Sequence, residues 1–258
     1  MASLIYVAAL TYKRPLMLPR LLEAWSTLRL PEYADVQFLI IDNDPAKSAR
    51  PIVESFAPRF EGRLEYLVEP EPGIPNARNR ALRAARDAGS DLLCFNDDDG
   101  YPARNWLVEL TRFQLATRVN LAFGPQRLSL PEQPISFWQR MVAAALVARA
   151  SFIERHARKE CRSNRIATSG TYNWMCDINW LSKKEIWFDQ SRSISGGSDT
   201  FFRETVSRAG GLLGWCPDAI VYERLQPERL SIRYQFRRAI SHGITSYHSG
   251  RKAFPNIL

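Results

Sequence analysis

The stretch Leu92-Leu93-Cys94-Phe95-Asn96-Asp97-Asp98-Asp99-Gly100 joins an apolar run to three consecutive carboxylates. The apolar run favours a buried strand, and Gly100 and Pro102 end it. Three adjacent negative charges repel one another unless a cation or hydrogen-bond donors balance them. The alternate residues Asp97 and Asp99 can point to one side, where carboxylate oxygens suit Mg²⁺ or Mn²⁺. A solvated strand-to-turn junction is the alternative, so the rest of the chain must decide.

Before this stretch the chain alternates between strand-like and helix-like patterns. Strands are expected at residues 3–10, 36–41, 64–68 and 91–95, and helices at 18–28, 51–60 and 76–88. Residues 69–75 are expected to form a loop because they are rich in proline and glycine. Strands that alternate with helices form parallel sheets joined by right-handed crossovers. The sequence therefore predicts an α/β fold, with a Rossmann-like, mostly parallel sheet flanked by helices.

After Gly100 the pattern is less regular. We expect helices at 106–115, at 135–156 and after Ser198, short strands within 121–124 and 212–222, and strand or loop at 170–178 and 187–189. From Arg224 onward the chain is strongly basic, and no repeat or clear linker precedes it. The prediction is one domain over residues 1–223 and a basic, helical C-terminal extension over residues 224–258.

Polar side chains follow three of the predicted strands. The first strand is followed by Thr11, Tyr12 and Arg14, the second ends in Asp42-Asn43-Asp44, and the fourth ends in the triple aspartate. Ligands of parallel α/β sheets bind outside the carboxyl ends of the strands, so these groups are expected to converge on one site. The second cluster could hydrogen-bond a base or ribose, and an Asx turn is its alternative.

Other side chains could contact the same ligand. Arg78 and Asn79 follow Gly73-Ile74-Pro75 and could contact phosphate or sugar, but a solvated basic helix face also explains them. Trp174 could stack on an acceptor sugar, with core packing as the alternative. Glu223 and His242 could each complete a metal shell, whereas a surface glutamate and an exposed loop histidine are the plainer interpretations.

The segment Gly196-Gly197-Ser198-Asp199 has two interpretations. Ser198 or Asp199 could cap the helix that follows, because a side-chain oxygen accepts hydrogen bonds from the free N–H groups of its first turn. Alternatively, Gly197 lets the backbone pass close to a substrate while Asp199 serves as a general base. The sequence of this segment alone favours the cap.

Composition narrows the possible partners. The 258 residues carry a formal net charge of +8, and the pI is about 9.5. This charge favours an anionic partner, such as a phosphorylated small molecule, an anionic membrane surface or nucleic acid. Nucleic acid is disfavoured because no reading motif accompanies the basic residues. In the tail, Tyr234, Phe236 and Tyr247 are interspersed with basic residues. This pattern fits docking to an anionic membrane, and a solvated helix face is the alternative interpretation.

The sequence also bears on the cellular compartment. The four cysteines form no CxxC pair, which argues against a zinc cluster or a redox motif. The first residues do not resemble a signal peptide, and no run reaches the roughly 18 to 20 apolar residues of a spanning helix. We expect a cytoplasmic protein that is either free or peripheral on the inner face of the membrane.

In their order and spacing, these motifs resemble those of family 2 glycosyltransferases, an inverting family with the GT-A fold, from Ser3 to about Gly243. The triple aspartate looks like the family's DXD motif, Ala77-Arg78-Asn79 like its A-R-N segment, and Asp199 like the aspartate of its GG-E-D-T motif. Two positions depart from the pattern. Ser198 replaces an acidic residue before the base, and Asn43 replaces a second aspartate at the end of the second strand.

The resemblance implies a role for each motif. It makes Asp199 the general base and Mn²⁺ or Mg²⁺ the cofactor, with Asp99 and Asp97 as ligands and Glu223 or His242 completing the shell. The implied acceptor side contains Trp174, Gly197 and Ser198. The implied donor contacts are Thr11, Tyr12, Arg14, Asp42, Asn43, Asp44, Arg78, Asn79, Asp97 and Asp98.

The expected function is transfer of a sugar from a nucleotide diphosphate donor, with a UDP-sugar preferred, to a hydroxyl group with inversion. The acceptor would be a carbohydrate or lipid-linked molecule of polysaccharide or glycolipid assembly. A catalytically degenerate sugar-nucleotide-binding scaffold is one alternative. A nucleotidyltransferase is another, but it would normally need a glycine-rich phosphate loop, and residues 11–15 contain no glycine.

Overall fold

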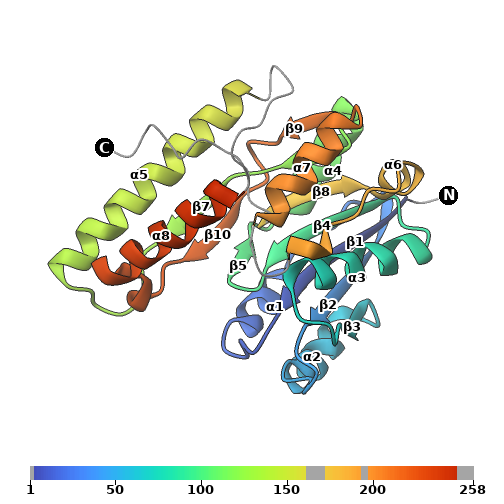
Figure 1. Cartoon of the computed structure of the whole chain (residues 1–258). Coiled ribbons are helices and arrows are strands. Elements are labelled where there is room, and N and C mark those ends of the chain that lie inside the picture. Colours follow the sequence, from blue (N-terminus) through green and yellow to red (C-terminus); the bar gives the residue numbers. More distant parts are fainter. Residues whose placement is uncertain (1–2, 161–171, 193–196, 249–258) are drawn as a thin grey trace.

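The strands of this computed structural model form two sheets (Figure 1). The structure describes residues 3–160, 172–192 and 197–248, but not the side chains of residues 158, 160 and 241–248. In spatial order the seven-stranded sheet contains β3 (Leu64–Val68), β2 (Ala34–Asp42), β1 (Ser3–Thr11), β4 (Leu92–Asp97), β8 (Asn173–Asp177), β6 (Leu121–Phe123) and β9 (Leu213–Trp215). The three-stranded sheet contains β5 (Gly100–Pro102), β10 (Val221–Arg224) and β7 (Gln126–Ser129).

The large sheet is mostly parallel. Strands β3, β2, β1 and β4 all run in one direction. Strand β8 runs antiparallel to both β4 and β6, and β9 is parallel to β6. The register pairs Leu10 with Asp97 and Thr11 with Asp42, so the polar strand ends lie at one edge of the sheet. The predicted α/β fold with a mostly parallel sheet is confirmed.

Helices cover both faces of this sheet (Figure 1). One face packs against α1 (Leu18–Ser26), α2 (Arg50–Phe56) with the 3₁₀ turn η1 (Ala57–Phe60), and α4 (Trp106–Thr117). The other face packs against α3 (Ile74–Asp87), α6 (Ile178–Lys183) and α7 (Ser198–Arg208), with η3 (Gln190–Arg192) preceding α7. The remaining elements are α5 (Phe137–Glu160), η4 (Pro227–Leu230) and α8 (Ile232–His248).

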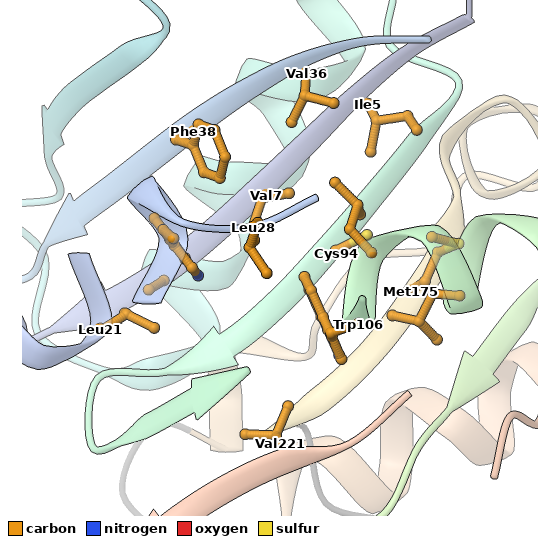
Figure 2. Close-up of a cluster of buried hydrophobic side chains, with 14 of the residues drawn as sticks. Ile5, Val7, Leu21, Leu28, Val36, Phe38, Cys94, Trp106, Met175 and Val221 are labelled. Atoms are coloured by element: carbon orange, nitrogen blue, oxygen red, sulfur yellow. The ribbon is translucent and has the colours of Figure 1, made fainter. Parts of the chain in front are cut away.

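The core follows from the two-residue alternation of the strands. Ile5 and Val7 of β1 point to one face, together with Phe38 of β2, and they belong to the same apolar cluster as Trp106 of α4 (Figure 2). Tyr6, between Ile5 and Val7, packs on the opposite face. Full burial of a large apolar side chain stabilises a fold by about 1.5 to 3 kcal/mol. Both faces are apolar, as expected for a parallel sheet covered by helices on each side.

The C-terminal segment is tied to the middle of the chain. A third apolar cluster joins Ala143 of α5 to Leu225 and Leu230 around η4. Figure 1 shows α5 and α8 at the side of the molecule, away from the large sheet. Because β10 continues through Arg224, the expected boundary between residues 223 and 224 falls inside a strand. The division into a domain and an extension stays a prediction.

Three expected boundaries differ from the structure. The predicted loop 69–75 ends at Gly73, and α3 starts at Ile74 with a proline in its first turn, where a missing N–H costs nothing. The helix expected at 51–60 is divided into α2 and the 3₁₀ turn η1. The region 135–156, expected to hold one or two helices, contains the single helix α5.

Asn173 of β8 links several elements through one buried side chain. Its Nδ2 donates to the carbonyl oxygens of Pro125 at 2.9 Å and Ala219 at 2.7 Å, while its Oδ1 accepts from Nε1 of Trp106 at 2.8 Å. The residue has no exposed surface. It therefore connects β8 to α4 and to the segments that lead into β7 and β10.

Replacement of this side chain tests its structural role. Asn173→Ala leaves the buried Trp106 Nε1–H and the Ala219 carbonyl oxygen without their side-chain partner, each costing about 1 to 3 kcal/mol. The Pro125 carbonyl oxygen still accepts from the N–H of Val221. We expect a loss of roughly 3 to 5 kcal/mol in the free energy of unfolding, measured by urea denaturation. Asn179→Ala is the matched control, because that exposed amide bonds only Asp91. Equal losses in the two variants would contradict the role of Asn173.

Candidate active site

A cavity of about 640 Å³ opens at the carboxyl ends of β1 and β4. Thr11, Tyr12 and Arg14 contribute to its wall from the end of β1, and the triple aspartate from the end of β4. Further wall residues come from the start of α3, the residue before β8, the start of α7 and η4, and they include Gly73, Arg78, Tyr172, Asp199 and Arg229. The first and fourth strand ends thus meet at one cavity, as the sequence predicts.

Asp98 connects the first strand end to the fourth. Its carboxylate accepts from Oγ1 of Thr11 at 3.0 Å and from Nη1 of Arg14 at 3.1 Å. Burial raises the pKa of Asp98, and the charge of Arg14 offsets part of that rise. These two hydrogen bonds hold the Asp98 carboxylate between the ends of β1 and β4, so Asp98 fixes the shape of the cavity wall.

Asp97 is the least compensated carboxylate in the cavity. Burial raises its pKa to about 7, Arg78 opposes that rise, and the charges of Asp99, Asp199 and Asp98 add to it. Among the described residues, its carboxylate has no side-chain hydrogen bond or ion pair. A cation beside Asp97 would remove this penalty, because an opposite charge favours the ionised carboxylate.

Asp99 is held by an arginine from the C-terminal segment. Nη2 of Arg229 donates to its carboxylate at 3.1 Å, and Nη1 of Arg14 lies 3.8 Å from it. The other terminal nitrogen of Arg229 donates to Glu223 at 3.0 Å. Burial disfavours the charge of Arg229, but Asp99 and Glu223 outweigh it and raise the pKa of the guanidinium. Arg229 therefore bridges two carboxylates.

Arg229 belongs to the basic tail of the sequence and was not expected to take part in the site. Its position six residues after Glu223, across the turn that contains Pro227, was the available signal. Glu223, expected as a metal ligand, instead pairs with Arg229 and accepts from Gln126 at 2.7 Å. Glu223 is not among the residues that line the cavity. The side chain of His242, the other expected ligand, is outside the described residues.

The carboxylates of the cavity suit a small, hard cation that is also coordinated by phosphate oxygens of a bound substrate. No three His, Cys, Asp or Glu side chains in the described part of the chain are grouped to hold a metal by themselves. Asp97 and Asp99 both line the cavity. Mg²⁺ and Mn²⁺ sites of substrate phosphates commonly use one or two carboxylates with water and phosphate oxygens. These two aspartates therefore fit such an ion.

Asp199 lies in the first turn of α7 and faces the same cavity. Gly197 occupies the N-cap position with a φ of 74°, a left-handed conformation that glycine adopts without strain. Neither Ser198 nor Asp199 is the N-cap, so the capping interpretation is wrong. Arg78 forms an ion pair with Asp199, and Oγ of Ser198 donates to the same carboxylate at 3.1 Å.

Arg78 reaches this position from the buried side of α3. The residue is 5% exposed, and its guanidinium lies 5.2 Å from the ring centroid of Phe188. Burial of an arginine requires charged or polar partners, which Asp199 and Ser198 supply. The solvated basic face that was the alternative for Arg78 is therefore wrong.

Several residues expected to contact ligand instead stabilise the surrounding structure. Asp42 has no exposed surface, and its carboxylate accepts from the backbone N–H groups of Asp44 and Ala49 and from the Tyr66 hydroxyl. Asp44 forms the Asx-type contact with the N–H of Ala46 that was its alternative. These two carboxylates close the turn after β2, and neither lines the cavity.

Three further assignments are corrected by burial. Trp174 is 1% exposed and stacks on Phe95, with ring centroids 4.7 Å apart, so it belongs to the core rather than to the acceptor side. Asn79 bonds both the N–H and the carbonyl oxygen of Phe188 and is also buried. Ser198, expected on the acceptor side, is 6% exposed and lies beneath Asp199.

Asn43 lines the cavity but is also held in place by the loop before α3. Its Nδ2 donates to the carbonyl oxygens of Glu69 and Glu71 at 2.8 and 2.7 Å, and its Oδ1 accepts from the N–H of Gly73 at 2.9 Å. The side chain therefore fixes residues 69–73, of which Pro72 and Gly73 line the cavity.

The chain is similar in sequence to a known protein family and to one of its relatives. The sequence model of glycosyl transferase family 2 matches residues 6–182. The succinoglycan biosynthesis protein ExoM of Rhizobium meliloti (strain 1021) is 29% identical over 242 residues, which cover 93% of this chain and 73% of the relative.

Solved structures share the fold at low identity. TarS 1–349 of S. aureus in complex with UDP is 13% identical with a TM-score of 0.62, and the match covers 94% of this chain and 64% of that solved chain. The mannosyltransferase PcManGT of Pyrobaculum calidifontis, in complex with GDP-Man and Mn²⁺, is 17% identical with a TM-score of 0.66, covering 97% and 66%. The chain thus spans slightly less than two thirds of either solved chain.

The charge of Asp97 gives a test of the cation site. In EDTA at pH 8, Asp97→Asn removes a crowded buried charge, so we expect the melting temperature to rise by about 3 to 6 °C. Mn²⁺ should stabilise the unsubstituted protein and have little effect on this variant. Asp35→Asn, at an exposed carboxyl of β2, is the control. If Mn²⁺ stabilised the Asp97 variant as strongly as the unsubstituted protein, Asp97 would not be a ligand.

Proposed function

The chain belongs to glycosyl transferase family 2, and from this premise we propose that it transfers a sugar from a nucleotide diphosphate donor to a hydroxyl group with inversion. The observation that carries the proposal is the shared cavity of Asp97, Asp99 and Asp199. Inverting transfer needs a base for the attacking hydroxyl and positive charge for the departing diphosphate. This cavity contains candidates for both.

Asp199 is the proposed general base. Its carboxylate takes the proton of the acceptor hydroxyl as the oxygen attacks the anomeric carbon, while the bond to the diphosphate breaks on the opposite side. The first turn of α7 presents partial positive charge to this anion. Arg78 and Ser198 hold the carboxylate in place. The side chain is 32% exposed, so an acceptor can reach it.

Other residues of the chain receive the donor. Thr11, Tyr12 and Arg14 line the cavity where nucleotide and phosphate are proposed to bind, and Asn43 supports the opposite wall through residues 69–73. Arg14 is half-exposed, so its guanidinium can turn toward a phosphate. Asp97 and Asp99 are the proposed ligands of Mn²⁺ or Mg²⁺, which when bound neutralises charge on the leaving diphosphate.

Three relatives support the choice of substrate class. TarS was solved with UDP and with UDP-GlcNAc, and the mannosyltransferase with GDP-Man and Mn²⁺. ExoM is named for succinoglycan biosynthesis. We therefore propose a nucleotide-sugar donor, with UDP as the preferred nucleotide, and a carbohydrate or lipid-linked acceptor of polysaccharide or glycolipid assembly.

We also propose that the protein is cytoplasmic and binds peripherally to the inner, anionic face of the membrane. None of the helices within the described residues is both long enough and apolar enough to cross a bilayer. The outward face of α5 is nevertheless apolar, with Phe137 and Trp138 each 68% exposed and Met141 55% exposed. Exposed aromatic residues of this kind are typical of helices that lie in the membrane interface.

Helix α8 has the same character and adds positive charge. Ile232, Phe236 and Ile240 recur every four residues and are all exposed, so they form one apolar stripe. Arg233 and Arg237 are exposed next to this stripe. Each basic residue near an anionic surface contributes about 1 kcal/mol to binding. Apolar and basic groups together favour a membrane over a merely solvated helix face.

Substitution of the base separates catalysis from donor binding. Asp199→Asn cannot accept the proton, so we expect kcat to fall roughly 10²- to 10⁴-fold while the affinity for a UDP-sugar with Mn²⁺ changes little. Transfer is followed by release of UDP, and donor binding by thermal shift. Glu204→Gln on the same helix is the control. Transfer at near the unsubstituted rate in the Asp199 variant would rule out this base.

Membrane binding is tested with vesicles. The double variant Trp138→Ala/Phe236→Ala should co-sediment with phosphatidylcholine–phosphatidylglycerol vesicles at least about fivefold more weakly, because it removes two exposed anchors. Leu115→Ala, at an exposed apolar residue of α4, should bind as the unsubstituted protein does. Co-sedimentation that is unaffected by the double change would exclude these two helices as the contact surface.

A further inference from the structure

A second cavity, of about 430 Å³, shares Asp98 and Asp99 with the cavity of about 640 Å³ in which the donor is proposed to bind. Its other lining residues come from different segments. Residues 16–17 and Arg20 line it from the start of α1, residues 131–133 from the loop before α5, and residues 224–227 from the end of β10 to η4. The proposed reaction gives no role to this cavity. Its chemical character comes from Arg20 and Arg224.

Arg20 is oriented in advance by an aromatic ring. Its guanidinium lies 4.6 Å from the ring centroid of Tyr101, which in turn stacks on Tyr222 with centroids 5.5 Å apart. Stacking fixes the plane of a guanidinium and leaves the N–H groups at its edge available for an anion. Among the described residues, the only carboxylate that Arg20 contacts is Glu132, at 3.7 Å, too far for a hydrogen bond.

Arg224 approaches the same carboxylate. Its guanidinium forms an ion pair with Glu132, while its Nε is buried and has no hydrogen-bond partner among the described residues. Both guanidinium groups contact the same oxygen of Glu132, Oε1, so they lie close together. Burial and the neighbouring charge of Arg224 accordingly lower the pKa of Arg20. Two arginines therefore share one carboxylate and keep unused donors.

Glu132 is the exchangeable member of this group. Its side chain is 78% exposed, compared with 38% for Arg20 and 24% for Arg224. An exposed ion pair contributes little stability, so Glu132 can leave at small cost. A phosphate carries up to two negative charges and several acceptor oxygens, and arginine pairs bind it through parallel hydrogen bonds. It would satisfy both guanidinium groups better than one carboxylate does.

We propose that Arg20 and Arg224 form a clamp for a phosphate group, which displaces Glu132. The rest of the lining favours a phosphate that carries an apolar chain, because Leu16, Met17 and Leu225 also face the cavity. Loop residues 131–133 lead directly into Phe137 and Trp138 of α5, the proposed membrane contact. The inference that the phosphate belongs to a lipid rests on the proposed membrane contact. The inference that Arg20 and Arg224 bind phosphate does not depend on it.

The first arm of the test uses soluble phosphate. The full chain is titrated with inorganic phosphate and with pyrophosphate, followed by calorimetry, without metal or nucleotide sugar, so that a failure of the proposed transfer reaction cannot affect the result. Arg20→Gln/Arg224→Gln should weaken binding at least about tenfold. Glu132→Gln removes the competing charge at an exposed position and should strengthen binding severalfold. Arg29→Gln/Arg112→Gln, at exposed positions after α1 and on α4, is the matched control for net charge.

The second arm identifies the source of the phosphate. Co-sedimentation is compared for phosphatidylcholine vesicles that contain phosphatidic acid, a phosphate monoester, or phosphatidylglycerol at matched surface charge. A lipid ligand predicts a preference for phosphatidic acid that the clamp variant loses and the Arg29→Gln/Arg112→Gln control keeps. If only soluble phosphate depends on the clamp, the lipid assignment is overturned and the clamp stands. If the clamp variant and Glu132→Gln match the unsubstituted protein in both arms, the proposal is wrong.

Discussion

The repulsion among carboxylates at the ends of β4 and α7 is the constraint on which the rest of the site depends. Asp97, Asp98, Asp99 and Asp199 line one cavity, and burial adds to the cost of the charge on Asp97 and Asp98. The chain offsets this cost with arginines from three distant segments: Arg14 after β1, Arg78 on α3 and Arg229 in η4. Asp97 is left with the least compensation, which is where a divalent cation would stabilise the protein most.

The same arginines connect the site to the architecture. Arg78 is buried between α3 and α7, so the position of the proposed base depends on how these two helices pack on the sheet. Arg229 ties Asp99 to Glu223 of β10, and therefore links the proposed metal site to the small sheet and to η4. Because η4 leads into α8, the proposed donor site and the proposed membrane surface are joined through one short segment.

Part of the site was predictable because it depends on local pattern. The apolar run that ends in three aspartates fixed β4 and its polar end, and strand alternation placed that end beside Thr11. Asp42 and Trp174 could not be predicted correctly. Asp42 is absorbed by a turn whose N–H groups come from Asp44 and Ala49, and Trp174 alternates into the core of β8. A polar or aromatic residue near a strand end does not show which way its side chain points.

The sequence by itself determined the α/β class, the order of the first strands and helices, and the meeting of the first and fourth strand ends. These features depend on periodicity and on parallel pairing, which operate over short stretches of chain. Only the tertiary structure decided that Arg229 bridges Asp99 and Glu223, that Arg78 holds Asp199, and that Arg20 and Arg224 share Glu132. Each of these contacts, except that of Arg229 with Glu223, joins residues about ninety or more positions apart. Their distance in space is set by how sheets and helices pack, which no local pattern encodes.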